Sequence, residues 1–178
     1  MKLFKKSKIK KNQVGAMSAI EMALIIAVGV VALYAAVAYG PKLWASSDNS
    51  RELENISSLV TNVRNLKTVS GYGASGTNLV PQLITAGAVP GPMTISGTTI
   101  INTWGGVVTI VSTGYGFTVT APSIPATGCI FLATKFAATG SVTTKINSGT
   151  AVSGEVTSAA ATTGCNGATN TIVWSSAT

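Results

Sequence analysis

The sequence predicts an α+β fold in which a long N-terminal α-helix packs on a small antiparallel β-sheet. The first seventy residues hold a long apolar run followed by apolar residues at helical spacing, whereas β-branched and turn residues dominate the rest. Hydrophobic residues make up 46% of the 178 residues and charged residues only 10%. This share of charged residues is well below the roughly 25% that is usual for soluble domains.

The composition argues against an enzyme and against a metal or cofactor site. The chain has no histidine, which removes the commonest general base and the commonest metal ligand. Its five acidic residues form no pair outside one helical stretch, and its two cysteines cannot supply a four-ligand zinc site. Six of the twelve basic residues precede Asn12 and the remaining chain is nearly neutral, so no nucleic acid binding is expected.

Residues 22–39 form an uncharged apolar run of 18 residues, long enough for a membrane span. A helix from Ser18 to Gly40 would be about 34 Å long, which exceeds the roughly 30 Å of a hydrocarbon core. The lysines before this run predict a cytoplasmic N-terminus and a body on the other side of the membrane. Proline removes a backbone donor, so a kink is expected where Gly40 and Pro41 follow the run.

Three interpretations of this segment remain open on the residues alone. It is a single-pass anchor, or it is a secretory signal peptide, since residues 36–38 (AVA) fit the cleavage pattern after an apolar core. The third interpretation gives Glu21 a function, because a carboxylate at bilayer depth is costly and usually marks a functional site. Against it, Glu21 stands at the head of the run and can reach the cytoplasmic interface at little cost.

Residues 15–21 (GAMSAIE), followed by an apolar helix, resemble the processing site of type IV prepilins. The resemblance implies that a dedicated membrane peptidase removes a basic leader, residues 1–16, on the cytoplasmic side. The new N-terminus would then be methylated, and the family's glutamate would be the fifth residue of the mature chain.

Counting back from Glu21 makes Met17 the first mature residue, with cleavage after Ala16. A methionine in this place resembles the type IVb subclass. The family prefers glycine before the cleaved bond, and cleavage after Gly15 would restore it but would make Glu21 the sixth residue. The Ala16–Met17 bond is the favoured site, and the Gly15–Ala16 bond stays the alternative.

Cleavage would create an α-amino group four residues before Glu21, which indicates a physical role for this carboxylate. In a dry bundle of such helices, each carboxylate can pair with the amine of a neighbouring subunit. Two unit charges 4 Å apart attract by about 4 kcal/mol at an effective dielectric constant of 20, before desolvation is subtracted. Because desolvation cancels much of this energy, the pair would set the register of the subunits more than their affinity.

Residues 41–70 are expected to continue the helix as an amphipathic segment. Its core-facing side consists of apolar residues: Leu53, Ile56, Val60 and Val63 recur at steps of three and four, and Leu59 and Leu66 lie beside them. The charged residues are expected mostly off this side: Arg51, Glu52, Glu54 and Arg64. Gly71 and Gly73 provide the stop signal.

The body, residues 71–178, is expected to hold a short helix and closely spaced strands. The helix spans residues 79–86, and residues 125–138 fit a helix or a strand, with a helical stripe that favours the helix. Strands are predicted where β-branched and aromatic residues gather between turns: 93–102, 107–112, 116–121, 142–146 and 170–175.

Two turns are predicted in this part of the chain. Thr113 and Gly114 form a short hairpin turn between two of the strands. Trp104 is expected as a core anchor beside a turn in which Gly105 and Gly106 provide left-handed or bulged backbone.

Cys129 and Cys165 lie 36 residues apart in the sequence. If the body is outside the cytoplasm, we expect them to form a structural disulfide, which stabilises by roughly 3–4 kcal/mol in the chain-entropy model. The alternative is a pair of inert buried thiols, and the chain offers no histidine to activate a catalytic thiolate.

The body adds to the resemblance. Residues 83–90 (LITAGAVP) and residues 101–106 (INTWGG) resemble type IVb major pilins of the conjugation, bundle-forming and toxin-coregulated kinds. The two cysteines match the C-terminal disulfide-bounded region of that subclass. Four parts are implied: a prepilin leader (1–16), a transmembrane and filament-core helix (17–40), its amphipathic continuation (41–70) and the globular pilin body (71–178).

The function that this resemblance implies is that of a major pilin, a structural subunit and not an enzyme. The precursor would be inserted in the bacterial inner membrane, cleaved and polymerised into an extracellular filament for adherence, aggregation or conjugation. Implied partners are copies of the chain itself, the prepilin peptidase, an assembly ATPase with its platform protein, a secretin and minor pilins. Small residues would let neighbouring helices pack closely: Ala27, Gly29, Ala32, Ala35 and Ala36.

Two rival functions remain open. One is a membrane-anchored or secreted surface-binding domain that does not polymerise, and the other is a minor pilin or a pseudopilin. The mature mass tests the first of them. Loss of 16 residues supports a pilin, loss of 38 supports signal peptidase, and no loss supports a plain anchor.

Overall fold

The computed structural model describes residues 19–136 and 142–177, so the predicted cleavage site at Gly15, Ala16 and Met17 lies outside the described residues. The chain divides into two compact units, Met1–Leu43 and Trp44–Thr178. Helix α1 (Ala19–Asn65) begins in the first unit and ends in the second. It is helical without interruption at residues 40 and 41, and the kink expected there stays a prediction.

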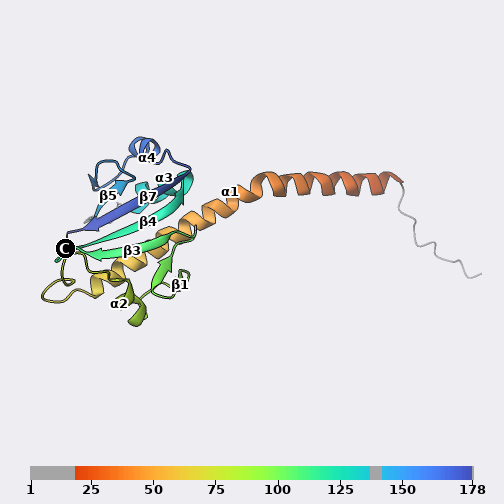
Figure 1. The fold of residues 1–178 in the computed structure, drawn as a ribbon. Helices are drawn as coiled ribbons and strands as arrows, with labels where there is room; N and C mark the ends of the chain where they lie inside the picture. The colour runs from red at the N-terminus through yellow and green to blue at the C-terminus, as the bar shows by residue number, and fades with distance from the viewer. Residues whose placement is uncertain (1–18, 137–141, 178) are drawn as a thin grey trace, which may run out of the picture. The chain divides into compact units, whose positions relative to one another are not determined.

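Within the described ranges, the second unit contains one seven-stranded antiparallel sheet (Figure 1). The spatial order of the strands is β1-β2-β3-β4-β7-β5-β6. The strands are β1 (Thr94–Ser96), β2 (Thr99–Ile101), β3 (Val107–Ser112), β4 (Phe117–Pro125), β5 (Val142–Ile146), β6 (Val152–Ser153) and β7 (Thr169–Ser176). The short helices are α2 (Val80–Thr85), α3 (Ala126–Phe136) and α4 (Ser158–Gly164). This architecture confirms the predicted α+β fold.

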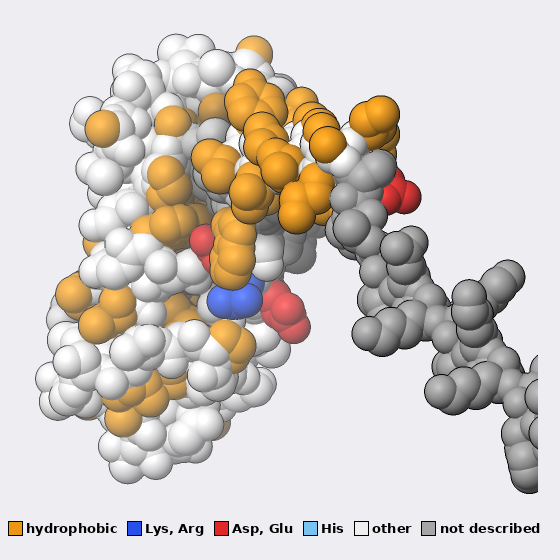
Figure 2. Space-filling model, turned by 90° about the vertical axis from the view of Figure 1, so that its right-hand side faces the viewer, with side chains coloured by type: hydrophobic (Ala, Val, Ile, Leu, Met, Phe, Trp, Pro, Cys, Tyr) orange, Lys and Arg blue, Asp and Glu red, His pale blue; other side chains and the backbone are white. Residues whose placement is uncertain are grey.

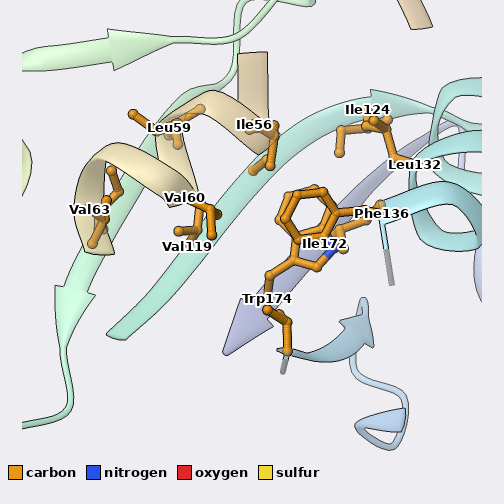
Figure 3. Close-up of a cluster of buried hydrophobic side chains, with 14 of the residues drawn as sticks. Ile56, Leu59, Val60, Val63, Val119, Ile124, Leu132, Phe136, Ile172 and Trp174 are labelled. Carbon is orange, nitrogen blue, oxygen red and sulfur yellow. The ribbon is translucent and has the colours of Figure 1, made fainter. Parts of the chain in front are cut away.

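The hydrophobic core lies between the body half of α1, helix α3 and one face of the sheet (Figure 3). Strand β7 alternates between buried and less buried residues, as a strand with one covered face should. Figure 3 shows Val60 of α1 beside Val119 of β4, and Phe136 of α3 against Trp174 of β7. The rings of Phe136 and Trp174 lie 4.9 Å apart between centroids. The first contact holds the second half of α1 to the sheet, and the second holds α3 to it.

The segment expected to be one strand, residues 93–102, is a hairpin, so this prediction is wrong. Strands β1 and β2 pair antiparallel, with Ile95 opposite Ile100. Gly97 between them has a φ of 59°, a left-handed conformation that glycine adopts without steric cost. The chain therefore reverses inside a run of β-formers.

The other predicted elements are present at the expected positions, and several differ in length. The expected helices at 79–86 and 125–138 are α2 and α3, and residues 137–138 lie outside the described residues. Strand β4 continues four residues beyond the expected end, with a register shift between Ala121 and Ile124. Strand β6 and helix α4 were not expected, because their Ser, Thr and Ala residues carry little periodic signal.

Candidate functional site

The membrane-length part of α1 is an exposed apolar surface. Residues 19–39 are exposed along the whole stretch, with 69% of Leu33 and 77% of Val37 accessible. In Figure 2, hydrophobic side chains (orange) form a nearly continuous surface. By length and composition the helix can cross a membrane. Apolar surface of this extent marks an interaction site, to be covered by lipid or by another apolar surface.

Glu21 lies in the first turn of α1, at the head of this apolar surface. A carboxylate near a helix N-terminus is favoured by the macrodipole. The α-amino group expected at Met17 lies outside the described residues, so the pairing of this amine with Glu21 stays a prediction.

Cys129 and Cys165 form a disulfide, with their Cα atoms 5.8 Å apart. Cys129 is fully buried in α3, and Cys165 directly follows α4. The loop that they close carries β5, β6 and α4. The bond therefore joins the outer part of the sheet to the core, and the alternative of two free thiols is excluded.

A hollow of about 450 Å³ lies in this disulfide-bounded region, between β5, β6 and α4. Its wall consists of aliphatic, glycine and threonine residues, among them Ile146, Val156 and Thr163. None of its lining residues is charged, so the hollow offers no group for acid–base or nucleophilic chemistry.

The turn between β2 and β3 is built on Asn102, which is buried. Its side-chain oxygen accepts hydrogen bonds from the backbone N–H groups of Trp104 and Gly106, at 3.0 and 2.7 Å. Its amide donates to the carbonyl of Pro122 at 2.6 Å. Trp104 packs against the core as expected, and its ring lies so close to Gly128 that a Cβ there would stand 2.9 Å from it.

Glu52 connects helix α1 to this turn. Its Oε2 accepts hydrogen bonds from the backbone N–H and the hydroxyl of Thr103, at 3.1 and 2.6 Å. The residue is fully buried, so the expectation that Glu52 lies off the apolar side is wrong. Positions 52, 56, 59 and 63 form one buried helical stripe. The prediction excluded Glu52 from this stripe only because its side chain is charged.

Replacing Thr103 by valine should lower the free energy of unfolding by about 1.5–3 kcal/mol, the range for hydrogen bonds to charged groups. The reason is that the buried Glu52 loses its 2.6 Å donor, while its Oε1 has no partner among the described residues. Urea unfolding of the full chain in detergent measures the change. Thr162→Val is the matched control, because that exposed hydroxyl binds only the Ser158 carbonyl of its own helix. Equal stability of both variants would contradict the role of Glu52.

The two glycines of the β2–β3 turn should respond differently to alanine. Gly105 has a φ of 80° and open space around its Cα, so Gly105→Ala should cost about 1–2 kcal/mol of backbone strain. At Gly106 a Cβ would run into the backbone carbonyl of Pro122 and stand 2.8 Å from Asn102 Nδ2. Gly106→Ala should therefore cost up to about 3 kcal/mol, more than Gly105→Ala. Thermal unfolding of both variants tests the order, and the reverse order would contradict this packing.

The described residues contain no group of three or more His, Cys, Asp and Glu side chains that could hold a metal ion. The exposed apolar part of α1 is the candidate interaction surface, and the second unit is an α+β body that carries the Cys129–Cys165 disulfide. A long N-terminal apolar helix, an antiparallel sheet and a disulfide-bounded C-terminal region together define the fold of type IV pilins.

The family model described as PilS N terminal matches residues 46–177. The chain therefore belongs to the PilS family of type IV pilins. Members of this family and fold are structural subunits and not enzymes, and they form pili by self-polymerisation. No curated protein gives a match.

Solved structures of type IV pilins are similar to the chain. A crystal structure of a type IVb pilin from Salmonella typhi is 30% identical over 70% of this chain and 97% of that one, with a TM-score of 0.59. An NMR structure of PilS from Salmonella typhi is 30% identical over 72% and 95%, with a TM-score of 0.50. TcpA, a type IV pilin from Vibrio cholerae El Tor, is 12% identical over 72% and 97%, with a TM-score of 0.52, and supports the fold alone.

Proposed function

We propose that the chain is the major structural subunit of a type IVb pilus. The precursor is inserted in the bacterial inner membrane with its N-terminus in the cytoplasm. Prepilin peptidase cleaves the Ala16–Met17 bond, and the mature chain leaves the membrane to join an extracellular filament. The observation that carries this proposal is the exposed apolar half of α1 on a chain of the PilS family.

The physical basis of assembly is an exchange of partners for this helix. In the membrane, lipid covers residues 20–39, which are exposed along their whole length. In the filament, the same surface packs against other copies. Small residues bring the backbones close: Ala27, Gly29, Ala32, Ala35 and Ala36. The contact is heterologous and does not close, so it produces a fibre and not a ring.

Glu21 has a part in this assembly through the amine that cleavage creates at Met17. Glu21 lies in the first turn of α1, at the head of the apolar surface, and this position supports such a pairing. Pairing between Glu21 of one copy and the Met17 amine of a neighbour neutralises two charges in the filament core. The assembly ATPase, its platform protein, the secretin and minor pilins are the partners that this route requires.

The test is N-terminal sequencing of material sheared from bacteria that produce the chain, with electron microscopy of the same fraction. We expect filaments whose subunits begin at Met17, with a methylated amine. Filaments beginning at Ala16 would move the cleavage site to the Gly15–Ala16 bond. Dispersed subunits that begin at Tyr39 or retain residues 1–16 would overturn the proposal in favour of a secreted or anchored domain.

A further inference from the structure

The start of α1 within the body carries an exposed aromatic residue. Trp44 is 74% exposed, although an indole is among the side chains that gain most from burial. Asp48 lies one helical turn further along and therefore on the same face of the helix. This end of the body presents a large apolar side chain beside a negative charge.

The opposite end of the body carries a hollow of about 330 Å³. It lies where α1 has ended, and Leu66, Tyr72 and Leu79 form its apolar wall, with Gln82 of α2 among its lining residues. The hydroxyl of Tyr72 is buried and has no hydrogen-bond partner among the described residues. Val69, which is fully exposed, follows the helix at the same end.

The wall of the hollow is held by the hairpin between β3 and β4. The N–H of Tyr72 donates to the carbonyl of Gly114 at 2.8 Å, and the ring of Tyr72 packs edge-on against Phe117 at 5.2 Å. A Cβ at Gly71 would collide with the same Gly114 carbonyl. The hollow is therefore a formed feature of the body and does not depend on a flexible loop.

Basic residues stand beside the hollow, in contrast to Asp48 at the other end. Arg64 is close enough to Tyr72 to lower its pKa, against the larger effect of burial, which raises that pKa. Lys67 lies between Leu66 and Thr68, which both line the hollow, and it is exposed. Arg51 and Glu54, which follow Asp48 on α1, offset each other in charge, so Asp48 is opposite in charge to Arg64 and Lys67 at the other end.

We propose that Trp44 of one copy inserts into the Leu66–Tyr72–Leu79 hollow of the next copy, with Asp48 facing Arg64 and Lys67. The 21 helical steps from Trp44 to Asn65 separate the two ends by about 32 Å. The contact is therefore head-to-tail and repeats without closing, which builds a column of bodies along a filament. This inference rests on the proposed function and adds the body-to-body contact to it.

Cross-linking in assembled filaments tests the contact directly. The full chain carries Trp44→Cys together with Gln82→Cys, and a short bismaleimide joins free thiols in the sheared fraction. Because Gln82 lines the hollow beyond the end of α1, and the helix from Trp44 to Asn65 is about 32 Å long, a short linker can join only neighbouring copies. We expect a ladder of covalent multimers. Trp44→Cys with Thr98→Cys, an exposed position in the β1–β2 turn, is the matched control and should give none.

A charge exchange provides a second measurement that needs no cysteine. Asp48→Lys should lower the yield of sheared filaments, and adding Lys67→Asp in the same chain should restore it. Trp44→Ala should lower the yield roughly tenfold or more, as truncation of a central interfacial aromatic does. All three variants change exposed or half-exposed side chains, so the amount of subunit in the membrane should stay unchanged.

The outcomes separate this inference from the proposed function. The inference would be overturned if filaments of the Trp44→Cys, Gln82→Cys variant gave no ladder, or if the control gave an equal ladder. A full yield of sheared filaments from Trp44→Ala would overturn it as well. Each of these outcomes would leave the pilus function intact. Loss of subunit from the membrane in Trp44→Ala would overturn it too, since Trp44 would then be an anchor at the bilayer interface. Absence of filaments from the unmodified chain would remove both.

Discussion

Replacing Glu21 by alanine is expected to stop filament formation while the processed subunit accumulates in the membrane. In the proposed filament, the substitution would leave the Met17 amine of each neighbouring copy charged and unpartnered in an apolar bundle. Removing one partner of a buried ion pair costs about 3–5 kcal/mol, which corresponds to a loss of a hundredfold or more at the contact. The measurement compares sheared filament yield with the amount and N-terminal sequence of the membrane fraction.

Two controls make this result specific. Glu155→Ala removes an exposed carboxylate of the body and should leave the yield unchanged. Glu21→Asp keeps the charge but shortens its reach, so it should retain part of the yield. If Glu21→Ala subunits are cleaved at Met17 and assemble at the normal yield, the carboxylate–amine pair has no role in assembly. If cleavage itself fails, Glu21 acts in recognition by the peptidase instead.

Replacing both Cys129 and Cys165 by alanine is expected to produce the largest loss of stability in the body. The disulfide closes a loop of 36 residues, and its removal should cost roughly 3–4 kcal/mol. For a body of this size, that loss corresponds to a decrease of the unfolding temperature by roughly 10–15 °C. Thermal unfolding of the full chain in detergent, followed by circular dichroism, provides the measurement.

A reductant supplies the matched control for this prediction. The unmodified chain treated with dithiothreitol should unfold near the temperature of the double variant, whereas the double variant should not respond to the reagent. The loss should be concentrated in β5, β6 and α4, which lie inside the closed loop. If hydrogen exchange became faster throughout the sheet, with no greater increase in β5, β6 and α4 than elsewhere, the local role of the bond would be contradicted.

Several features of this protein were predictable from the sequence because they depend on neighbouring residues. The apolar run, the core-facing stripe at Ile56, Val60 and Val63, and the helix α3 all follow from spacing along the chain. The strands β3 and β5 occur where β-branched residues gather between turns. The chain has two cysteines, so one intramolecular pairing was to be expected if the body lies outside the cytoplasm, and the structure contains this disulfide.

The features that sequence reasoning missed depend on residues far apart in the chain. Glu52 is buried because Thr103, 51 positions away, supplies two donors to its carboxylate. The short strand β6 exists through its pairing with β5, and the hollow beside Tyr72 needs the β3–β4 hairpin. The sequence by itself determined the helix, the strand-forming segments and the disulfide, since local periodicity and composition decide them. Only the tertiary structure decided which polar groups are buried and where surfaces open, because long-range packing sets solvent exposure.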